Sequence, residues 1–218
     1  MNIGDHIIYK DNQLLVFNKP AGIPTQKDKT EDKSLLDLAE IYAKKKLWVT
    51  NRLDRPASGI TIFAKTPTAA AHINALFADR KVNKKYIIAV AKGIEGDGQL
   101  SHHIKHQPLS NKAKVTEKAI KGSKPAELEY KRIKELDKYD LFEVTSKSGR
   151  HHQIRAQFAH HGFPIKGDIK YGARRSNKDR SIHLHCKSIQ VSHPISGNQI
   201  DLYCLPMSED SIWKTLAI

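Results

Sequence analysis

A single carboxylate, Asp54, lies between two arginines, Arg52 and Arg55, in a segment of turn-forming residues. The segment spans residues 51–59 and leads into an apolar run that ends at Ala64. A carboxylate fixed among arginines at the start of a strand is an arrangement that enzymes use for catalysis. The alternative is a structural role, in which Asp54 caps a turn or pairs with one of its arginine neighbours.

The 12 histidines of the chain are candidate metal ligands. Around one predicted helix they recur after eight or nine residues, whereas a helical zinc pair needs a spacing of four. Three others have no carboxylate or cysteine close to them in the sequence. We therefore expect no metal site. The histidines concerned are His151, His152, His160 and His161 around the helix, and His102, His103 and His106 in a predicted strand.

Other catalytic patterns are absent. Ser58-Gly59 lacks the G-x-S-x-G elbow of hydrolases, and neither Cys186 nor Cys204 has an activating context. The glycine-rich stretch 93–98 lacks the Lys-Ser/Thr ending of a phosphate loop. Glycosidase chemistry would need a second, comparably placed acid. These observations leave one carboxylate as the centre of any chemistry.

The elements that must position Asp54 are mostly strands. Ser34 with Asp37 is typical of a capping box at a helix start, and Thr66-Pro67 indicates a second start. Strands do not alternate regularly with helices, so we expect one α+β domain over residues 1–218: a mixed, mostly antiparallel sheet, flanking helices and a central active-site cleft. Predicted strands cover 6–9, 13–18, 60–65, 84–91, 100–106, 112–117, 126–135, 140–146, 182–191 and 200–205; predicted helices begin at 34, 67, 148 and 208.

Composition indicates a polyanionic partner. The 218 residues include 37 Lys and Arg against 23 Asp and Glu, a formal charge of +14, and such an excess favours binding to nucleic acid phosphates. Two cysteines without a CxxC pattern suggest a reducing compartment. The N-terminus has no signal-peptide core, and no apolar run approaches the roughly 18 residues of a membrane span. We expect a cytoplasmic protein that binds RNA or DNA and no membrane.

Two further groups complete the chemical set: Tyr86, in a Lys-Lys-Tyr strand, and Arg155, in a Gln-Ile-Arg helix. With them the sequence resembles the RluA-type RNA pseudouridine synthases over nearly its whole length. The matching segments, in order, are Leu15–Pro24, Arg52-Leu53-Asp54 with Ser58-Gly59 and Ala64-Lys65, Lys84-Lys85-Tyr86, Gly149–Arg155, Gly167-Asp168 with Tyr171-Gly172, and Leu184-His185 with His193-Pro194. Each is weak alone, but six in the right order are specific.

The resemblance implies a pseudouridine synthase-like fold and isomerisation of uridine to pseudouridine in ribosomal or transfer RNA, without a cofactor. It implies that Asp54 acts at the sugar, by covalent attack or by assisting a glycal-like intermediate. It also implies that Arg155 pairs with Asp54 and that Tyr86 takes the C5 proton. The expected RNA-binding residues are Arg52, Arg55, Lys84, Arg150, His152, Gln153, Lys170, Arg174 and Arg175, the last three in the basic loop 170–180.

Some positions depart from the family pattern. Asn51 stands where the family usually has His, and Ala57 where it has Thr. His151 and Gln157 likewise replace a usual Thr and His. The opening motif begins within the first twenty residues, so we expect no S4 module before it, a short stem-loop RNA target and a monomer. The alternatives are a catalytically silent RNA-binding or chaperone protein on the same scaffold, and a metal-dependent nuclease, which would need a carboxylate cluster.

Overall fold

The computed structural model describes residues 2–216 and divides into two compact units. Unit 1 comprises the chain up to Lys84 and again from His185, and unit 2 comprises Lys85–Leu184. Unit 1 carries Asp54, whereas unit 2 carries Tyr86 and Arg155. None of the helices in residues 2–216 combines the length and the apolar character that crossing a bilayer requires.

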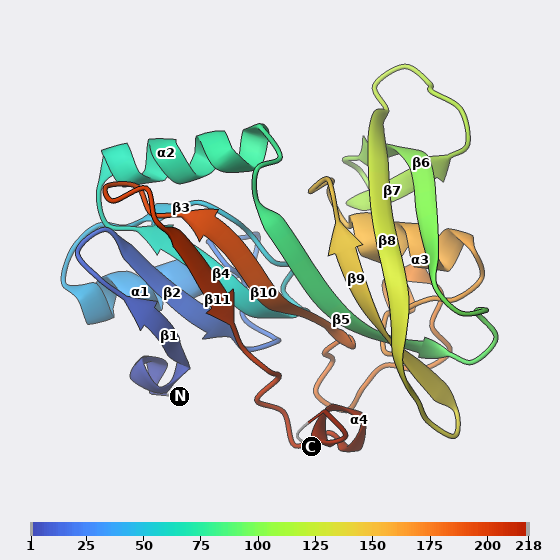
Figure 1. The fold of residues 1–218 in the computed structure, drawn as a ribbon. Coiled ribbons are helices and arrows are strands. Elements are labelled where there is room, and N and C mark those ends of the chain that lie inside the picture. Colours follow the sequence, from blue (N-terminus) through green and yellow to red (C-terminus); the bar gives the residue numbers. More distant parts are fainter. Residues whose placement is uncertain (1, 217–218) are drawn as a thin grey trace. The chain divides into compact units, whose positions relative to one another are not determined.

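Unit 1 is built on a twisted sheet in the order β1-β2-β4-β10, with β11 beside β10 and β3 beside β4 (Figure 1). The pairs β1–β2, β2–β4, β3–β4 and β10–β11 are antiparallel, whereas β10 runs parallel to β4. The elements are η1 (Ile3–His6), β1 (Ile7–Lys10), β2 (Leu14–Lys19), α1 (Leu35–Ala43), β3 (Trp48–Val49), β4 (Ser58–Ala64), α2 (Pro67–Ala78), β10 (Leu184–Ser192), β11 (Gln199–Tyr203) and α4 (Ser211–Lys214).

The core of unit 1 fixes β4, which follows the Asp54 segment, and β2, its neighbour in the sheet. Every residue of β2 is buried, and β4 is buried after its first residue. Helix α1 packs on them, since its Leu35 and Ala39 join Leu15, Phe17 and Phe63 in one apolar cluster. The capping box of Ser34 and Asp37 is confirmed at the start of α1, as is the Thr66 cap before α2.

Gly59 allows β4 and β10 to approach at the exit of the Asp54 segment. Its φ is +117°, and a Cβ at this position would lie within 3.0 Å of the backbone of Cys186. Glycine reaches this region of backbone space without steric cost, unlike other residues. The glycine thus lets β4 begin directly after the turn that carries Asp54.

Unit 2 is an antiparallel sheet in the order β5-β9-β8-β6-β7. Helix α3 lies behind the sheet in the view of Figure 1, and its Ala156 packs with Ile104, Ala113 and Ala126 of three strands. The elements are β5 (Asn83–Ala91), β6 (Gly98–Gln107), β7 (Lys112–Thr116), β8 (Lys124–Glu135), β9 (Tyr139–Ser146), α3 (Gln153–His160) and η2 (Ile169–Tyr171).

The predicted helix start at Ser148 is wrong. Helix α3 begins at Gln153, and His152 before it has a left-handed φ of 51°. The Ser148 hydroxyl donates to Gln153 Oε1 at 2.8 Å and accepts from Glu127 N at 3.3 Å, so it does not cap a helix N–H. Gln153 Oε1 also accepts from Arg150 N at 3.1 Å. Because the Gln153 side chain satisfies the preceding turn, residues 148–152 stay non-helical. The predicted stop at Gly162 is confirmed, with φ +84° one residue after the C-cap.

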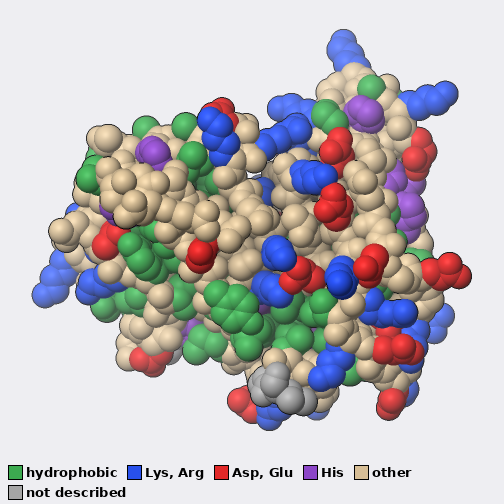
Figure 2. All heavy atoms as spheres, viewed as in Figure 1, with side chains coloured by type: hydrophobic (Ala, Val, Ile, Leu, Met, Phe, Trp, Pro, Cys, Tyr) green, Lys and Arg blue, Asp and Glu red, His purple; other side chains and the backbone are tan. Residues whose placement is uncertain are grey.

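The expected fold class, α+β with a mixed and mostly antiparallel sheet, is confirmed, and each predicted strand is present with ends shifted by a few residues. The positive charge is not gathered into one patch on the face seen in Figure 2, where Lys and Arg side chains alternate with Asp and Glu. On this face, then, a phosphate backbone would meet separated cations rather than a continuous basic stripe.

Candidate active site

The Asp54 turn is held by the loop that follows β2. Thr25 brackets Leu53: its hydroxyl donates to Leu53 O at 3.0 Å and accepts from Leu53 N at 3.1 Å. Gly22 N donates to Arg55 O at 2.8 Å, and Ala57 N closes the turn on Asp54 O at 3.0 Å. The residues on both sides of Asp54 are thereby fixed. Two segments some thirty residues apart in the sequence form one rigid scaffold for the carboxylate.

Asn51 fastens the start of the same segment to β4. Its side-chain amide donates to Ile60 O at 3.1 Å, and its carbonyl oxygen accepts from Ile62 N at 2.7 Å. These are the two backbone groups that a neighbouring strand would have satisfied. The departure from the usual His at this position therefore supplies a side chain whose amide continues the sheet's hydrogen bonding.

Lys19, at the end of β2, is the residue that sequence reasoning missed. The side chain is fully buried, and its Nζ donates to Pro20 O at 2.8 Å, Ile23 O at 2.9 Å and Arg55 O at 3.3 Å. Burial lowers its pKa to about 7, opposed by the negative charge of Asp54, which raises it. Lys19 thus ties the loop to the Asp54 turn and brings a positive charge to the carboxylate. Its signal in the sequence is a lysine that closes a strand, two residues after the apolar run that ends at Phe17.

Arg55 is paired with two carboxylates of the loop that precedes α1. Its guanidinium bonds both oxygens of Asp28, at 3.1 and 3.0 Å, and Asp32 Oδ2 at 2.7 Å, with Thr30 as a further partner. The bonded carboxylate of Asp32 raises the pKa of Arg55, and Arg55 in turn helps to lower the pKa of both acids. The predicted RNA contact of Arg55 would have to compete with these two carboxylates.

Ser58 and His185 join β4 to β10 beside the same turn. Ser58 Oγ lies 2.9 Å from His185 Nδ1, and His185 Nε2 lies 3.1 Å from Cys204 O. The carbonyl can only accept, so Nε2 carries the proton and Nδ1 accepts from the serine hydroxyl. Burial lowers the pKa of His185 to about 4. A neutral imidazole oriented by a backbone carbonyl makes this pair a structural link.

In unit 2, Arg155 is held in a buried ion pair with Asp168. Nε and Nη2 of Arg155 donate to the two Asp168 oxygens at 2.7 and 2.8 Å, and both side chains are at most 4% exposed. The guanidinium carbon also lies 5.1 Å from the ring centroid of Tyr171. Such a two-pronged pair fixes the plane of the guanidinium. Asp168, within the Gly167-Asp168 motif, therefore sets the direction in which Arg155 points.

Tyr86 lies in β5 opposite Val144 of β9 and is half-buried. Lys85 and Glu143, whose Nζ and Oε1 lie 2.8 Å apart, belong to the opposite face of the sheet, because successive strand residues point to alternate faces. Tyr86 is therefore neither a core residue nor fully exposed, a position in which a phenol can meet a ligand.

The remaining predicted RNA-binding residues differ in exposure. Gln153 is buried and bonded to Ser148 and Glu127, and Lys84 is buried with Nζ 5.7 Å from the Phe77 ring centroid. Both positions are enclosed by protein groups. Arg52, Arg174 and Arg175 are exposed, whereas Lys170, Arg150 and His152 are half-buried; Arg150 Nε donates to Pro125 O, and His152 Nδ1 lies 2.9 Å from Tyr171 Oη.

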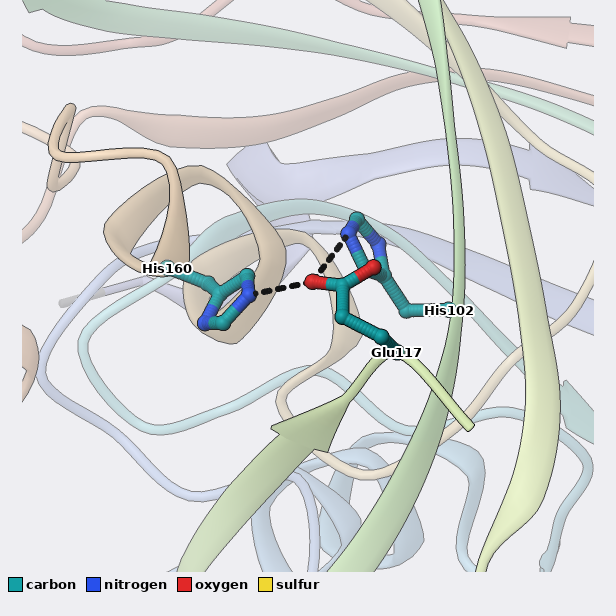
Figure 3. A group of neighbouring side chains, drawn as sticks. All are labelled: His102, Glu117 and His160. Atoms are coloured by element: carbon teal, nitrogen blue, oxygen red, sulfur yellow. Dashed lines mark hydrogen bonds and ion pairs between the residues drawn. The ribbon is translucent and has the colours of Figure 1, made fainter. Parts of the chain in front are cut away.

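His102 has no carboxylate close to it in the sequence, but the fold brings one to it. Glu117 and His160, distant in the sequence, lie beside His102 in unit 2, and the three side chains converge in Figure 3. Strand pairing of β6 with β7 and packing of α3 bring them together. Sequence spacing along one element could not reveal this group.

Comparison with known proteins decides the family. Residues 13–160 match the model of RNA pseudouridylate synthase, about two thirds of the chain. The chain belongs to the RNA pseudouridylate synthase family. The resemblance to the RluA-type enzymes is thereby confirmed, and with it the reaction class, isomerisation of uridine in RNA.

Two relatives and one solved structure of this family span most of the chain. A tRNA pseudouridine synthase C of Vibrio parahaemolyticus is 28% identical over 96% of this chain and 92% of its own length. A ribosomal large subunit pseudouridine synthase C of Buchnera aphidicola is 32% identical over 92% of this chain and 67% of its own. The human RNA pseudouridylate synthase domain containing 4 shares the fold, with a TM-score of 0.76 and 21% identity over 97% of this chain and 91% of that chain.

Proposed function

We propose that this pseudouridine synthase acts on uridines of transfer or ribosomal RNA, with Asp54, Tyr86 and Arg155 as catalytic residues. The observation that carries the proposal is the Asp54 turn. A half-buried carboxylate is held by backbone bonds on both sides and has the charge of Lys19 beside it. Catalysis needs such preorganisation, because a carboxylate that attacks or assists at the sugar must already be oriented when the base leaves.

The roles of the other two residues follow from their chemistry. Loss of the C5 hydrogen needs a base, and Tyr86 is the candidate; a phenol has a reference pKa near ~10, so a cation beside it would help. Arg155 is the candidate to stabilise negative charge at Asp54, and Asp168 holds its plane. The Asp54–Arg155 ion pair stays a prediction, since the two residues belong to different units.

The substrate is proposed from the relatives and from charge. Their names include both transfer RNA and ribosomal RNA enzymes, and the net charge of +14 suits a polyanion. A uridine must leave its stack to react, which costs a few kcal/mol and least in loops. We therefore favour a stem-loop target, bound by a monomer in the cytoplasm with the two units acting as one catalytic domain and no cofactor. Exposed Arg52, Arg174 and Arg175 are the proposed phosphate contacts.

Tritium release from RNA that carries [5-³H]uridine tests the proposal. The RNA should come from cells that lack this protein, so that its own sites are unmodified. We expect release by the wild type and by the Asp137→Asn control, which changes an exposed acid far from Asp54 in the sequence. The Asp54→Asn variant should release none while it still binds RNA. Equal release by Asp54→Asn would refute the role of Asp54, and RNA binding without any release by the wild type would favour a silent RNA-binding protein.

A further inference from the structure

Four side chains of unit 2 lie close together. His102 comes from β6, Glu117 from the residue after β7, and His160 and His161 from the end of α3. The ligand atoms of the first three all lie within 4.8 Å of one another (Figure 3). His161 joins them through His102, with the two Nε2 atoms 3.2 Å apart. No role in the proposed reaction uses these groups.

The spacings fit the ligand shell of a small divalent ion. Glu117 Oε1 lies 2.8 Å from His160 Nε2 and 3.8 Å from His102 Nε2. Zinc binds imidazole nitrogen and carboxylate oxygen at about 2.0–2.2 Å, so neighbouring ligand atoms of a tetrahedron lie about 3.3 Å apart. The three observed separations, including 3.2 Å between the imidazoles, lie within about half an ångström of that value. Small side-chain rotations would complete the shell.

The three side chains differ in exposure, with one buried ligand and two that solvent can reach. The His102 side chain is 3% exposed, whereas those of His160 and Glu117 are 39% and 70% exposed. A buried ligand at the base with solvent-accessible ligands above it allows an ion to enter without unfolding.

Gln157 sets the proton position on His102. Its Nε2 lies 2.9 Å from His102 Nδ1 and 3.2 Å from the carbonyls of Leu100 and Ala126. Without an ion, His102 Nδ1 accepts from the Gln157 amide, and His102 Nε2 carries the proton and faces His161. Binding through Nε2 moves the proton to Nδ1, which then needs an acceptor. Gln157 Oε1 is buried and has no hydrogen-bond partner among the described residues. Rotation of the amide would bring this oxygen to Nδ1, at the expense of the bonds to the two carbonyls.

We propose that His102, Glu117 and His160, with His161 or water as a fourth ligand, form a binding site for zinc or a similar late first-row divalent metal ion. Mixed nitrogen and oxygen donors favour these ions over Ca²⁺ and Mg²⁺, which take oxygen shells. The ion would link the end of α3 to the strands β6 and β7. It would stabilise the folded protein, because it binds the assembled ligands and not the unfolded chain.

Titration of the tag-free protein with Zn²⁺, and with Co²⁺ as a spectroscopic probe, tests the site. We expect one ion per chain by calorimetry, a rise in the thermal midpoint, and the visible absorption of tetrahedral Co²⁺. The double variant Glu117→Gln with His160→Asn changes exposed side chains, so that it should fold normally. It should bind at least tenfold more weakly.

A matched control separates this site from scattered histidines. His106 and His151 form another ring contact, with centroids 4.4 Å apart, and the variant His106→Asn with His151→Asn should bind the ion as the wild type does. The proposal is overturned if the wild type binds no Zn²⁺ at millimolar concentration, or if the Glu117→Gln, His160→Asn variant binds as tightly as the wild type. Loss of binding in the control pair alone would equally overturn it.

Discussion

Replacement of Lys19 by Met should separate the stability of the protein from its activity. Methionine keeps the length and apolar stem of the side chain but removes the ammonium. In the wild type, burial lowers the pKa of Lys19 from 10.5 to about 7. Each pKa unit corresponds to about 1.4 kcal/mol, so at neutral pH the folded state is destabilised by about 4 kcal/mol relative to a chain in which Lys19 is hydrated. The Met variant avoids this cost.

The Met variant also loses stability, because the carbonyl groups that accept from Lys19 lose their donor. Arg55 O keeps a donor, Gly22 N at 2.8 Å, but Pro20 O and Ile23 O lose the ammonium. An unsatisfied buried acceptor costs about 1–3 kcal/mol, hence ~2–6 kcal/mol for both. The two effects nearly cancel, and we expect Lys19→Met to unfold within about 2 kcal/mol of the wild type at pH 7.

The pH dependence distinguishes the variant from the wild type. Between about pH 7 and 10.5 the unfolded chain keeps a proton on Lys19 that the folded protein releases, so the wild type gains stability as the pH rises. The variant lacks this gain. Urea unfolding at pH 7 and about pH 9.5 should show the wild type gaining about 3 kcal/mol relative to Lys19→Met. If the difference in free energy of unfolding between wild type and Lys19→Met did not change with pH, the lowered pKa of Lys19 would be refuted.

Turnover should fall even where stability is unchanged. The loop and the Asp54 turn lose their common anchor, so we expect Lys19→Met to release tritium at least about tenfold more slowly, because misplacing a catalytic group by an ångström costs rate. RNA binding at fixed salt is the control for folding. Wild-type turnover in Lys19→Met would show that Lys19 serves the core alone.

Three further predictions follow from the ion pairs and the buried histidine. Asp168→Asn should abolish most tritium release and destabilise unit 2 by about 3–5 kcal/mol, because it leaves Arg155 buried without its carboxylate. Release at the wild-type rate would show that Asp168 does not position Arg155. The double variant Asp28→Asn with Asp32→Asn should free Arg55 to bind RNA, so that RNA affinity rises. The added phosphate contact should steepen the dependence of affinity on salt by about 0.7 log units per log unit. Weaker binding in a filter assay would mean that the two acids orient Arg55. His185 has a pKa of about 4, so below about pH 6.5 the unfolded chain binds a proton that the folded protein does not bind. The free energy of unfolding should therefore fall by about 3 kcal/mol between pH 6.5 and pH 4. The same fall in stability with acid in His185→Asn would contradict this.

Local signals in the sequence predicted most of the elements. Ser34 and Asp37 form the expected capping box, Thr66 and Pro67 start α2, and Gly162 ends α3. These features depend on residues a few positions apart, whose hydrogen bonds and backbone preferences are local. The predicted helix start at Ser148 failed because its outcome is not decided locally. Its outcome depends on Gln153 and Glu127, and Glu127 lies in another strand.

The sequence by itself determined the fold class and the family motifs and made Asp54 the candidate central acid, since residue type and order carry that information. Tertiary structure alone decided the partners: Lys19 and Thr25 holding the Asp54 turn, Asp28 and Asp32 holding Arg55, Asp168 holding Arg155, and Glu117 beside three histidines. Each partner is brought near by strand pairing or loop packing across tens of residues. A buried charge is tolerated only where such partners meet it, and periodicity along the chain cannot reveal which distant groups those are.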